Sequence, residues 1–76
     1  MKHGITIKCT VDYDLFGTNL KNKEGVLINT YPEREKYLVW FSCNQEYAEL
    51  SEDQFQIASD KVTKQNKDLI SRIRSL

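Results

Sequence analysis

Apolar and polar residues alternate strictly at the start of the chain, between Gly4 and Val11. One side of this segment carries Ile5, Ile7, Cys9 and Val11, and the other carries Thr6, Lys8 and Thr10. A repeat of two residues is typical of a β-strand with one buried face. The sequence therefore predicts a first strand from Gly4 to Val11 with its apolar side in the core.

The segment that follows, DYDLFGTNLKNKEG (residues 12–25), has no regular repeat. Its two glycines and its Asp and Asn residues indicate a long loop. Beyond it, β-branched and aromatic residues predict four more strands, at residues 26–31, 36–43, 46–50 and 56–58. Pro32 marks a turn after the second strand, and Ser51 with Gln54 predicts one capped helical turn before the last strand.

The stretch YLVWF, Tyr37 to Phe41, is apolar on both faces of its strand. In a small barrel Val39 and Phe41 would point inward, which leaves Leu38 and Trp40 on the outer face. Two large apolar side chains on the outside of so small a domain need a cover, because exposed apolar patches mark contact surfaces. Either the C-terminal segment or a binding partner is expected to cover them.

From Ser59 onward the apolar repeat changes to that of a helix. Val62, Leu69, Ile73 and Leu76 fall on one face, with Ile70 beside it. Ser59 or Asp60 is the expected N-cap. The sequence therefore predicts a barrel over residues 1–58 and an amphipathic helix over residues 59–76, which packs on the barrel or forms a dimer interface.

Three stretches carry a resemblance to a known family: Glu24 to Val26, Tyr37 to Phe41, and Ala48 to Phe55. With five short strands, a long first loop and one helical turn before the last strand, the chain resembles the Src-homology-3-like small barrels, which include the Tudor and KOW modules. Its strands are most similar to those of the variable subunit of ferredoxin–thioredoxin reductase. That resemblance implies a five-stranded antiparallel barrel and an accessory subunit without a metal cluster.

Charge changes this picture only in part, since the 11 Lys and Arg residues balance the 11 Asp and Glu residues. Phosphate binding usually needs a net basic surface, so the neutral total argues against nucleic acid as the first choice of partner. Acids outnumber bases before residue 60, and bases outnumber acids after it. A basic tail could still bind phosphates through Lys61, Lys64, Lys67, Arg72 and Arg74.

Catalytic and metal-binding chemistry has little support in the sequence. His3 is the only histidine and lies near the start of the chain, and Cys9 and Cys43 form no closely spaced ligand pair. We expect no enzyme activity, no metal and no cofactor, and we expect both cysteines to be reduced and buried on strands. No apolar run is long enough to cross a bilayer and no signal-peptide pattern is present, so a cytoplasmic location is expected.

The residues expected to contact a partner are aromatic and acidic. The aromatic candidates are Tyr13, Phe16, Tyr31, Tyr37 and Trp40, and the acidic candidates are Glu49, Glu52 and Asp53. Aromatic side chains beside a long loop can form a groove, and an acidic end can attract a basic partner. Core packing is the alternative for the aromatic residues, and simple solubility is the alternative for the acidic ones.

Taken together, the sequence favours a non-enzymatic protein-binding module, such as a small phage-type or regulatory modulator of a larger enzyme. Two alternatives stay open. One is a nucleic-acid-binding regulator that uses a KOW-like barrel and the basic helix. The other is an accessory subunit of a redox enzyme. The expected state is a monomer or a homodimer formed through the helix.

Overall fold

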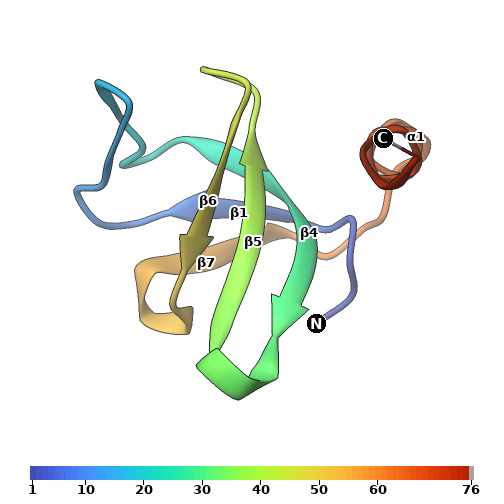
Figure 1. Cartoon of the computed structure of the whole chain (residues 1–76), viewed down its shortest axis with the longest axis horizontal. Coiled ribbons are helices and arrows are strands. Elements are labelled where there is room, and N and C mark those ends of the chain that lie inside the picture. The colour runs from blue at the N-terminus through green and yellow to red at the C-terminus, as the bar shows by residue number, and fades with distance from the viewer. Residues whose placement is uncertain (76) are drawn as a thin grey trace.

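The computed structural model describes residues 1–75, which form one antiparallel sheet and one C-terminal helix (Figure 1). The strands of the sheet are β1 (Thr6–Cys9), β4 (Glu24–Tyr31), β5 (Lys36–Phe41), β6 (Glu46–Leu50) and β7 (Phe55–Ser59). A small hairpin of β2 (Asp14–Leu15) and β3 (Thr18–Asn19) lies in the first loop. Two 3-10 turns, η1 (Pro32–Arg34) and η2 (Glu52–Gln54), precede β5 and β7, and α1 (Lys64–Arg74) follows them.

The sheet has the order β6-β5-β4-β1-β7, and all neighbouring strands are antiparallel. Three consecutive strands form a meander, and β7 returns to pair with β1. The strands β6 and β7 are the two edges, so the sheet of the described residues is strongly curved but not closed (Figure 1). The closed barrel expected from the sequence is therefore not shown, because β6 and β7 do not pair with each other.

The core lies on one face of the curved sheet, and β5 presents to it the residues that the expected barrel topology assigned to the inside. Val39 and Phe41 are fully buried, and Tyr37 packs at the margin of the core. Leu38 and Trp40 lie on the other face and are half-buried. The inward and outward assignment of this strand is confirmed.

The first long loop is more ordered than the sequence predicted. Phe16 and Gly17 both have positive φ, as the two central residues of a tight hairpin turn require, and they join β2 to β3. Asn19 holds the base of this hairpin, since its Oδ1 accepts from the amides of Tyr13 (3.2 Å) and Lys21 (3.0 Å). Leu20 then enters the core and is fully buried, although its polar surroundings in the sequence gave no sign of it.

Several predicted boundaries were wrong. The first strand is shorter than predicted and β4 is longer, beginning at Glu24. The strand β5 ends at Phe41, so Cys43 lies in an exposed turn and is not buried on a strand, whereas Cys9 is buried as predicted. The turn after β5 spans four residues, and the positive φ of Gln45 turns the chain into β6.

The helix begins five residues later than predicted. Ser59 still pairs with Thr6 in the β1–β7 ladder, so it cannot cap a helix. Thr63 is the N-cap, and its hydroxyl accepts a hydrogen bond from the amide of Asn66 (3.1 Å). Val62 precedes the helix and packs against the core, while Ile70 is the most deeply buried residue of α1. Leu76 lies outside the described residues.

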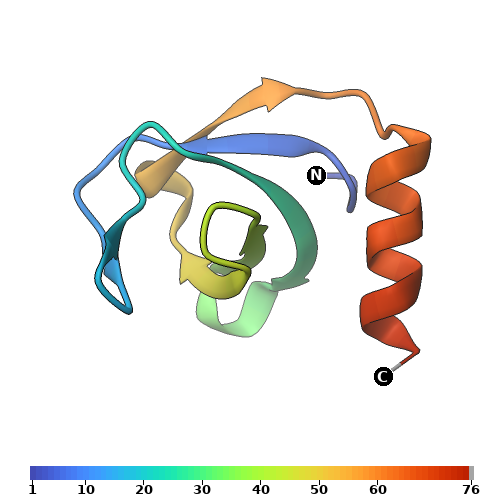
Figure 2. The same cartoon turned by 90° about the horizontal axis from the view of Figure 1, so that it is seen from above.

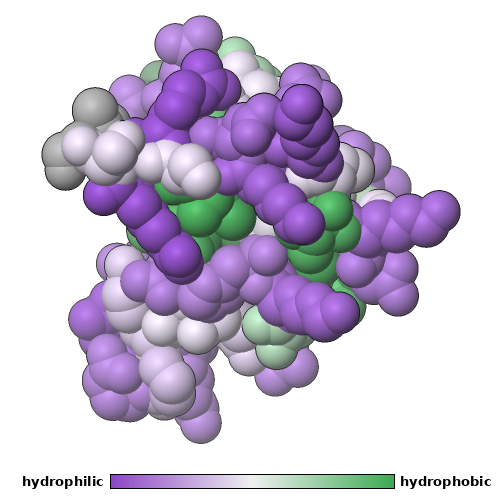
Figure 3. Space-filling view, turned by 90° about the vertical axis from the view of Figure 1, so that its right-hand side faces the viewer, coloured by the Kyte–Doolittle hydropathy of each residue, from purple (hydrophilic) through white to green (hydrophobic). Residues whose placement is uncertain are grey.

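Helix α1 lies beside the N-terminal segment of the chain (Figure 2). The side-chain amide of Asn66 donates to the carbonyl of Gly4 (2.8 Å) and to the hydroxyl of Thr6 (3.4 Å). Gly4 has a φ of 98°, and a Cβ atom there would lie 2.7 Å from Val62 Cγ1, so this close approach requires a glycine. Figure 3 shows that hydrophilic side chains cover most of this side of the molecule, with small hydrophobic areas between them. Nowhere in residues 1–75 is a helix long and apolar enough for a bilayer crossing.

Candidate functional site

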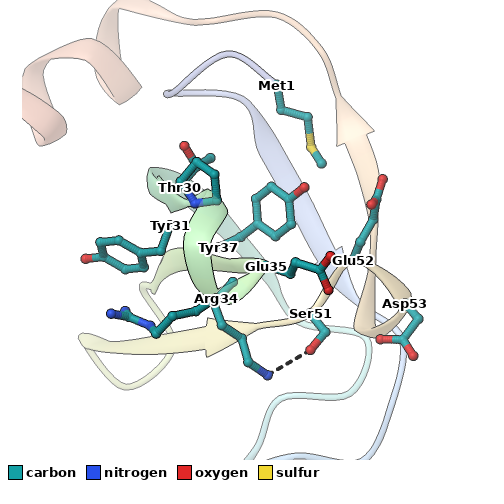
Figure 4. A pocket seen from close by; sticks show the side chains of 11 residues that line it. Met1, Thr30, Tyr31, Arg34, Glu35, Tyr37, Ser51, Glu52 and Asp53 are labelled. Carbon is teal, nitrogen blue, oxygen red and sulfur yellow. Dashed lines mark hydrogen bonds between the residues drawn. The ribbon is translucent and has the colours of Figure 1, made fainter.

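A groove of about 830 Å³ lies at the end of the sheet where the β4–β5 hairpin faces η2 (Figure 4). We call it the hairpin groove. Its lining residues are Met1, Thr30, Tyr31, Pro32, Arg34, Glu35, Lys36, Tyr37, Ser51, Glu52 and Asp53. These residues come from three separate segments: the N-terminal residue, the β4–β5 hairpin and the η2 turn.

The hairpin wall of the groove is shaped by η1. Pro32 starts this turn, and Glu35 ends it in the left-handed conformation with a φ of 54°. The guanidinium of Arg34 stacks 4.4 Å from the centre of the Tyr31 ring. The same guanidinium bonds to a carboxylate oxygen of Glu49 (3.2 Å), so the hairpin is tied to β6.

The opposite wall is formed by Ser51 and η2. The amide of Ser51 donates to the side-chain oxygen of Gln54 (2.8 Å), which is the reach-back predicted for a capped turn. The ammonium of Lys36 donates to the Ser51 hydroxyl (2.8 Å) and so links the two walls (Figure 4). Between the walls, Tyr37 packs edge-on against Phe55, with ring centres 5.3 Å apart. Its hydroxyl points toward Met1 (Figure 4).

Acids without an ion-pair partner within residues 1–75 lie on both walls of the groove, Glu35 on the hairpin wall and Glu52 and Asp53 on the η2 wall. All three residues are exposed. The two cationic side chains of the lining are already engaged, Arg34 with carboxylates and Lys36 with a hydroxyl. The groove therefore offers free carboxylates beside aromatic surface.

The predicted contact residues do not form one site. Four of them, Tyr31, Tyr37, Glu52 and Asp53, lie together in the hairpin groove. Glu49 is joined to it through its bond with Arg34. The other aromatic candidates, Tyr13, Phe16 and Trp40, do not line this groove.

Tyr13 and Phe16 belong to the first long loop. Tyr13 packs against the core, whereas Phe16 is 80% exposed at the tip of the β2–β3 hairpin. The loop is fastened to the turn after β5, because the side-chain amide of Asn44 donates to the carbonyl of Leu15 (3.2 Å). Neither aromatic residue lines the hairpin groove.

Trp40 lies on the outer face of the sheet beside a shallow hollow of about 160 Å³. The hollow is also lined by Thr6, Glu24, Gly25, Val26 and Ser42. No described residue of α1 lines it, so the helix does not cover this side of Trp40. In the strand register Val26, Trp40 and Tyr47 stand directly opposite one another, which makes a row of half-exposed and exposed side chains across three strands.

The basic candidates of the C-terminal segment are all exposed: Lys61, Lys64, Lys67, Arg72 and Arg74. Arg74 also lies 3.0 Å from Nδ1 of His3. The pKa of His3 is lowered by burial first, and then by the positive charges of Arg74 and the N-terminal amine. His3 is thus held in its neutral form, in which Nδ1 can accept a hydrogen bond from Arg74.

Residue-by-residue reasoning missed more than half of the groove lining. The missed residues are Met1, Thr30, Pro32, Arg34, Glu35, Lys36 and Ser51. The signal that could have found some of them is the stretch YPEREK, where a proline turn sets a tyrosine beside an arginine and two acids. The contribution of Met1 depends on a long-range approach that no local pattern reveals.

Within residues 1–75 no group of three His, Cys, Asp or Glu side chains is placed to hold a metal ion. Comparison of the chain with protein-family models, curated proteins and solved structures finds no match.

Proposed function

We propose that the chain is a non-enzymatic protein-binding module with the topology of a Src-homology-3-like small barrel. The strand order, the long first loop and the 3-10 turn before the last strand support this topology. The proposed role is that of a small modulator, which acts by binding a segment of a larger protein.

The observation that carries the proposal is the hairpin groove. Its volume of about 830 Å³ falls in the range of about 300–1,000 Å³ that is usual for ligand sites. Tyr31 and Tyr37 supply rigid amphipathic surface of the kind enriched in protein interfaces. Glu52 and Asp53 supply free negative charge, which favours a partner segment with Lys or Arg side chains.

The test is selection from a random displayed-peptide library on the purified protein. We expect enriched peptides to carry Lys or Arg next to an apolar residue. The double variant Glu52→Lys/Asp53→Lys should weaken their binding at least about tenfold, a factor that corresponds to 1.4 kcal/mol. Both residues are exposed, so the fold should survive the change.

A matched control reverses two exposed acids outside the groove, Asp60→Lys/Asp68→Lys. This variant has the same net charge as the groove variant, and it should bind the selected peptides as the unchanged protein does. Equal loss in the two variants would mean that only net charge matters. Peptides without basic residues, or full binding by the groove variant, would contradict the proposal.

The exposure of all five basic residues of the tail favours one alternative, nucleic-acid binding. Its test is binding of labelled RNA and DNA at two salt concentrations. A steep loss of affinity with salt, removed by Lys64→Glu/Lys67→Glu, would support it. The redox-subunit alternative gains no support from the arrangement of residues 1–75 and stays a prediction.

A further inference from the structure

The bases of the C-terminal segment do not all lie on one side of α1. A helix turns by about 100° per residue, which places four exposed residues within about 80° of one another around its axis. These residues are Lys64, Lys67, Ser71 and Arg74. Asp68 borders the sector at Lys64, and Arg72 lies beyond Asp68. The sector therefore holds three bases and no acid, and we call it the basic face.

The start of the chain adds to the positive charge at the basic face. Arg74 lies 3.0 Å from His3, and the N-terminal segment runs beside α1 (Figure 2). Lys2 precedes His3 and is exposed. The pKa of His3 is lowered by burial first and then by nearby positive charge, that of Arg74 foremost, which agrees with a positive potential at this place. Lys2 and the bases of the basic face have no ion-pair partner within residues 1–75.

Neither the folding of α1 nor its docking explains the two lysines of the basic face. Lys64 is the first residue of the helix, where a positive charge opposes the helix dipole, and the first turn contains no acid. The helix is held to the sheet through Asn66 and the buried Ile70, which are not part of the basic face. Lys67 is exposed and takes no part in that contact. Both lysines are therefore available to a ligand.

The side chains of the basic face select the kind of ligand. The face has no aromatic or apolar residue, whereas protein interfaces are usually anchored by such residues. Helices that lie on membranes insert an apolar face, but Ile70 of α1 is already buried in this chain. Lys, Arg and Ser side chains commonly contact the phosphate oxygens of nucleic acids. The composition of the face therefore favours a phosphate backbone.

The length of the basic face also fits a phosphate backbone. From Lys64 to Arg74 the helix axis advances by about 15 Å. The phosphates of one DNA strand recur about every 3.4 Å along the duplex, so several of them can be contacted at once. A single strand fits less well, because proteins that hold single strands stack the bases on aromatic side chains, and this face has none.

We propose that the basic face, together with Lys2, binds the phosphate backbone of a nucleic acid duplex without reading its sequence. The site joins two segments that are distant in the sequence and leaves out Lys61 and Arg72, so it differs from binding by the whole tail. It does not rest on the hairpin groove, and the two proposals can therefore fail independently.

The first test is fluorescence anisotropy of a labelled DNA duplex of random sequence, titrated with the full chain at several salt concentrations. The logarithm of the binding constant should fall against the logarithm of salt with a slope of about −3.6, which is about −0.9 for each of four bases. Lys64→Glu/Lys67→Glu should weaken binding at least about tenfold. Lys61→Glu/Arg72→Glu changes the net charge equally but lies outside the face, and it should weaken binding less than about threefold.

The second test concerns Lys2, which no pattern in the tail would predict. Lys2→Glu should weaken duplex binding at least about fivefold. Lys23→Glu changes an exposed base of the first loop and should leave binding within about twofold. In NMR titrations the duplex should also raise the pKa of His3, because the phosphates offset the charge of Arg74.

Melting curves establish that the variants are folded. Lys64→Glu/Lys67→Glu should keep or raise Tm, because it removes a positive charge from the start of α1. Lys64→Gln/Lys67→Gln is a milder pair that should also lose duplex binding. The proposal is overturned if the duplex does not bind at low salt, if the two double Glu variants lose binding equally, or if Lys2→Glu binds as the unchanged chain does. It is also overturned if the chain binds phosphatidylserine vesicles more tightly than it binds the duplex.

Discussion

The substitution Gly25→Ala tests the packing of β4 against β5. Gly25 is buried on β4 and stands opposite Phe41 of β5. A Cβ atom at this position would lie 2.5 Å from Val39 Cγ1, 2.8 Å from the carbonyl oxygen of Trp40 and 3.1 Å from Phe41 Cδ2. Two of these neighbours are fully buried side chains and one is backbone, so none can move aside freely.

The magnitude follows from two opposing effects. Overpacking of a core costs about 1–3 kcal/mol. Replacing glycine by alanine at a compatible site stabilises by about 0.4–1 kcal/mol, because the unfolded chain loses freedom. We therefore expect a net loss of about 1.5 kcal/mol, or a fall of about 6–12 °C in Tm for a domain of this size. The whole domain should be stable by about 4–11 kcal/mol at the usual value per residue.

Urea unfolding of Gly25→Ala, Val39→Ala and the double variant measures this effect. Val39→Ala removes the closest clashing atom. The loss of stability caused by Gly25→Ala should therefore be smaller in the Val39→Ala background than in the unchanged chain, by at least about 0.5 kcal/mol. Strict additivity, or unchanged stability of Gly25→Ala, would refute the reasoning about this contact.

Two further predictions concern the contact between α1 and the start of the chain. Asn66→Ala leaves the carbonyl of Gly4 without its hydrogen-bond donor, so α1 should detach from the sheet more often. The backbone amides of α1 should then exchange with solvent at least about fivefold faster. Gln65→Ala, at an exposed neighbouring position, should leave this exchange unchanged. In the folded chain the pKa of His3 is lowered below the ordinary value of 6.5. As pH falls below 6.5, the unfolded chain therefore binds more protons than the folded chain does. The stability that the neutral imidazole contributes is lost over this range. Melting at pH 7.5 and pH 5 should therefore show a larger acid loss for the unchanged chain than for His3→Gln, and equal losses would show that the contact with Arg74 has no part in stability.

Elements with a local cause could be predicted from the sequence. The alternation between Gly4 and Val11 depends only on neighbouring residues, and Ile5, Ile7 and Cys9 are buried as their spacing predicts. The capped turn at Ser51 and Gln54 also depends on a local hydrogen bond, and it forms as predicted.

Features that depend on distant pairing could not be predicted. The sequence predicted Ser59 as a helix N-cap, but its pairing with Thr6 places it in β7. Leu20 is buried because the loop around it folds back, held by the hydrogen bond from the amide of Tyr13 to the Asn19 side chain. No repeat of apolar residues in the sequence marks this position. The openness of the sheet is a property of strand geometry, and no local pattern encodes whether β6 and β7 meet.

The residues of the candidate site could likewise be predicted only in part. The sequence identified aromatic and acidic residues that could bind a partner, and four of them share one groove. It gave no basis for separating them from Trp40 on the outer face or Phe16 on the loop, because their grouping is decided by which strand ends lie together.

The two ends of the chain are fastened to each other. Asn66 bonds to Gly4 and Thr6, and Arg74 bonds to His3, across 60 to 71 positions of the sequence. A force that pulled the ends apart would load these few hydrogen bonds before any strand pair, so the helix would peel away first while the sheet stayed intact. A short peptide bridge between the ends would be compatible with this arrangement, and new ends could then be opened at the exposed Phe16–Gly17 turn. Under load, the contacts between α1 and the N-terminal segment thus act as a link that joins the two ends of the described chain.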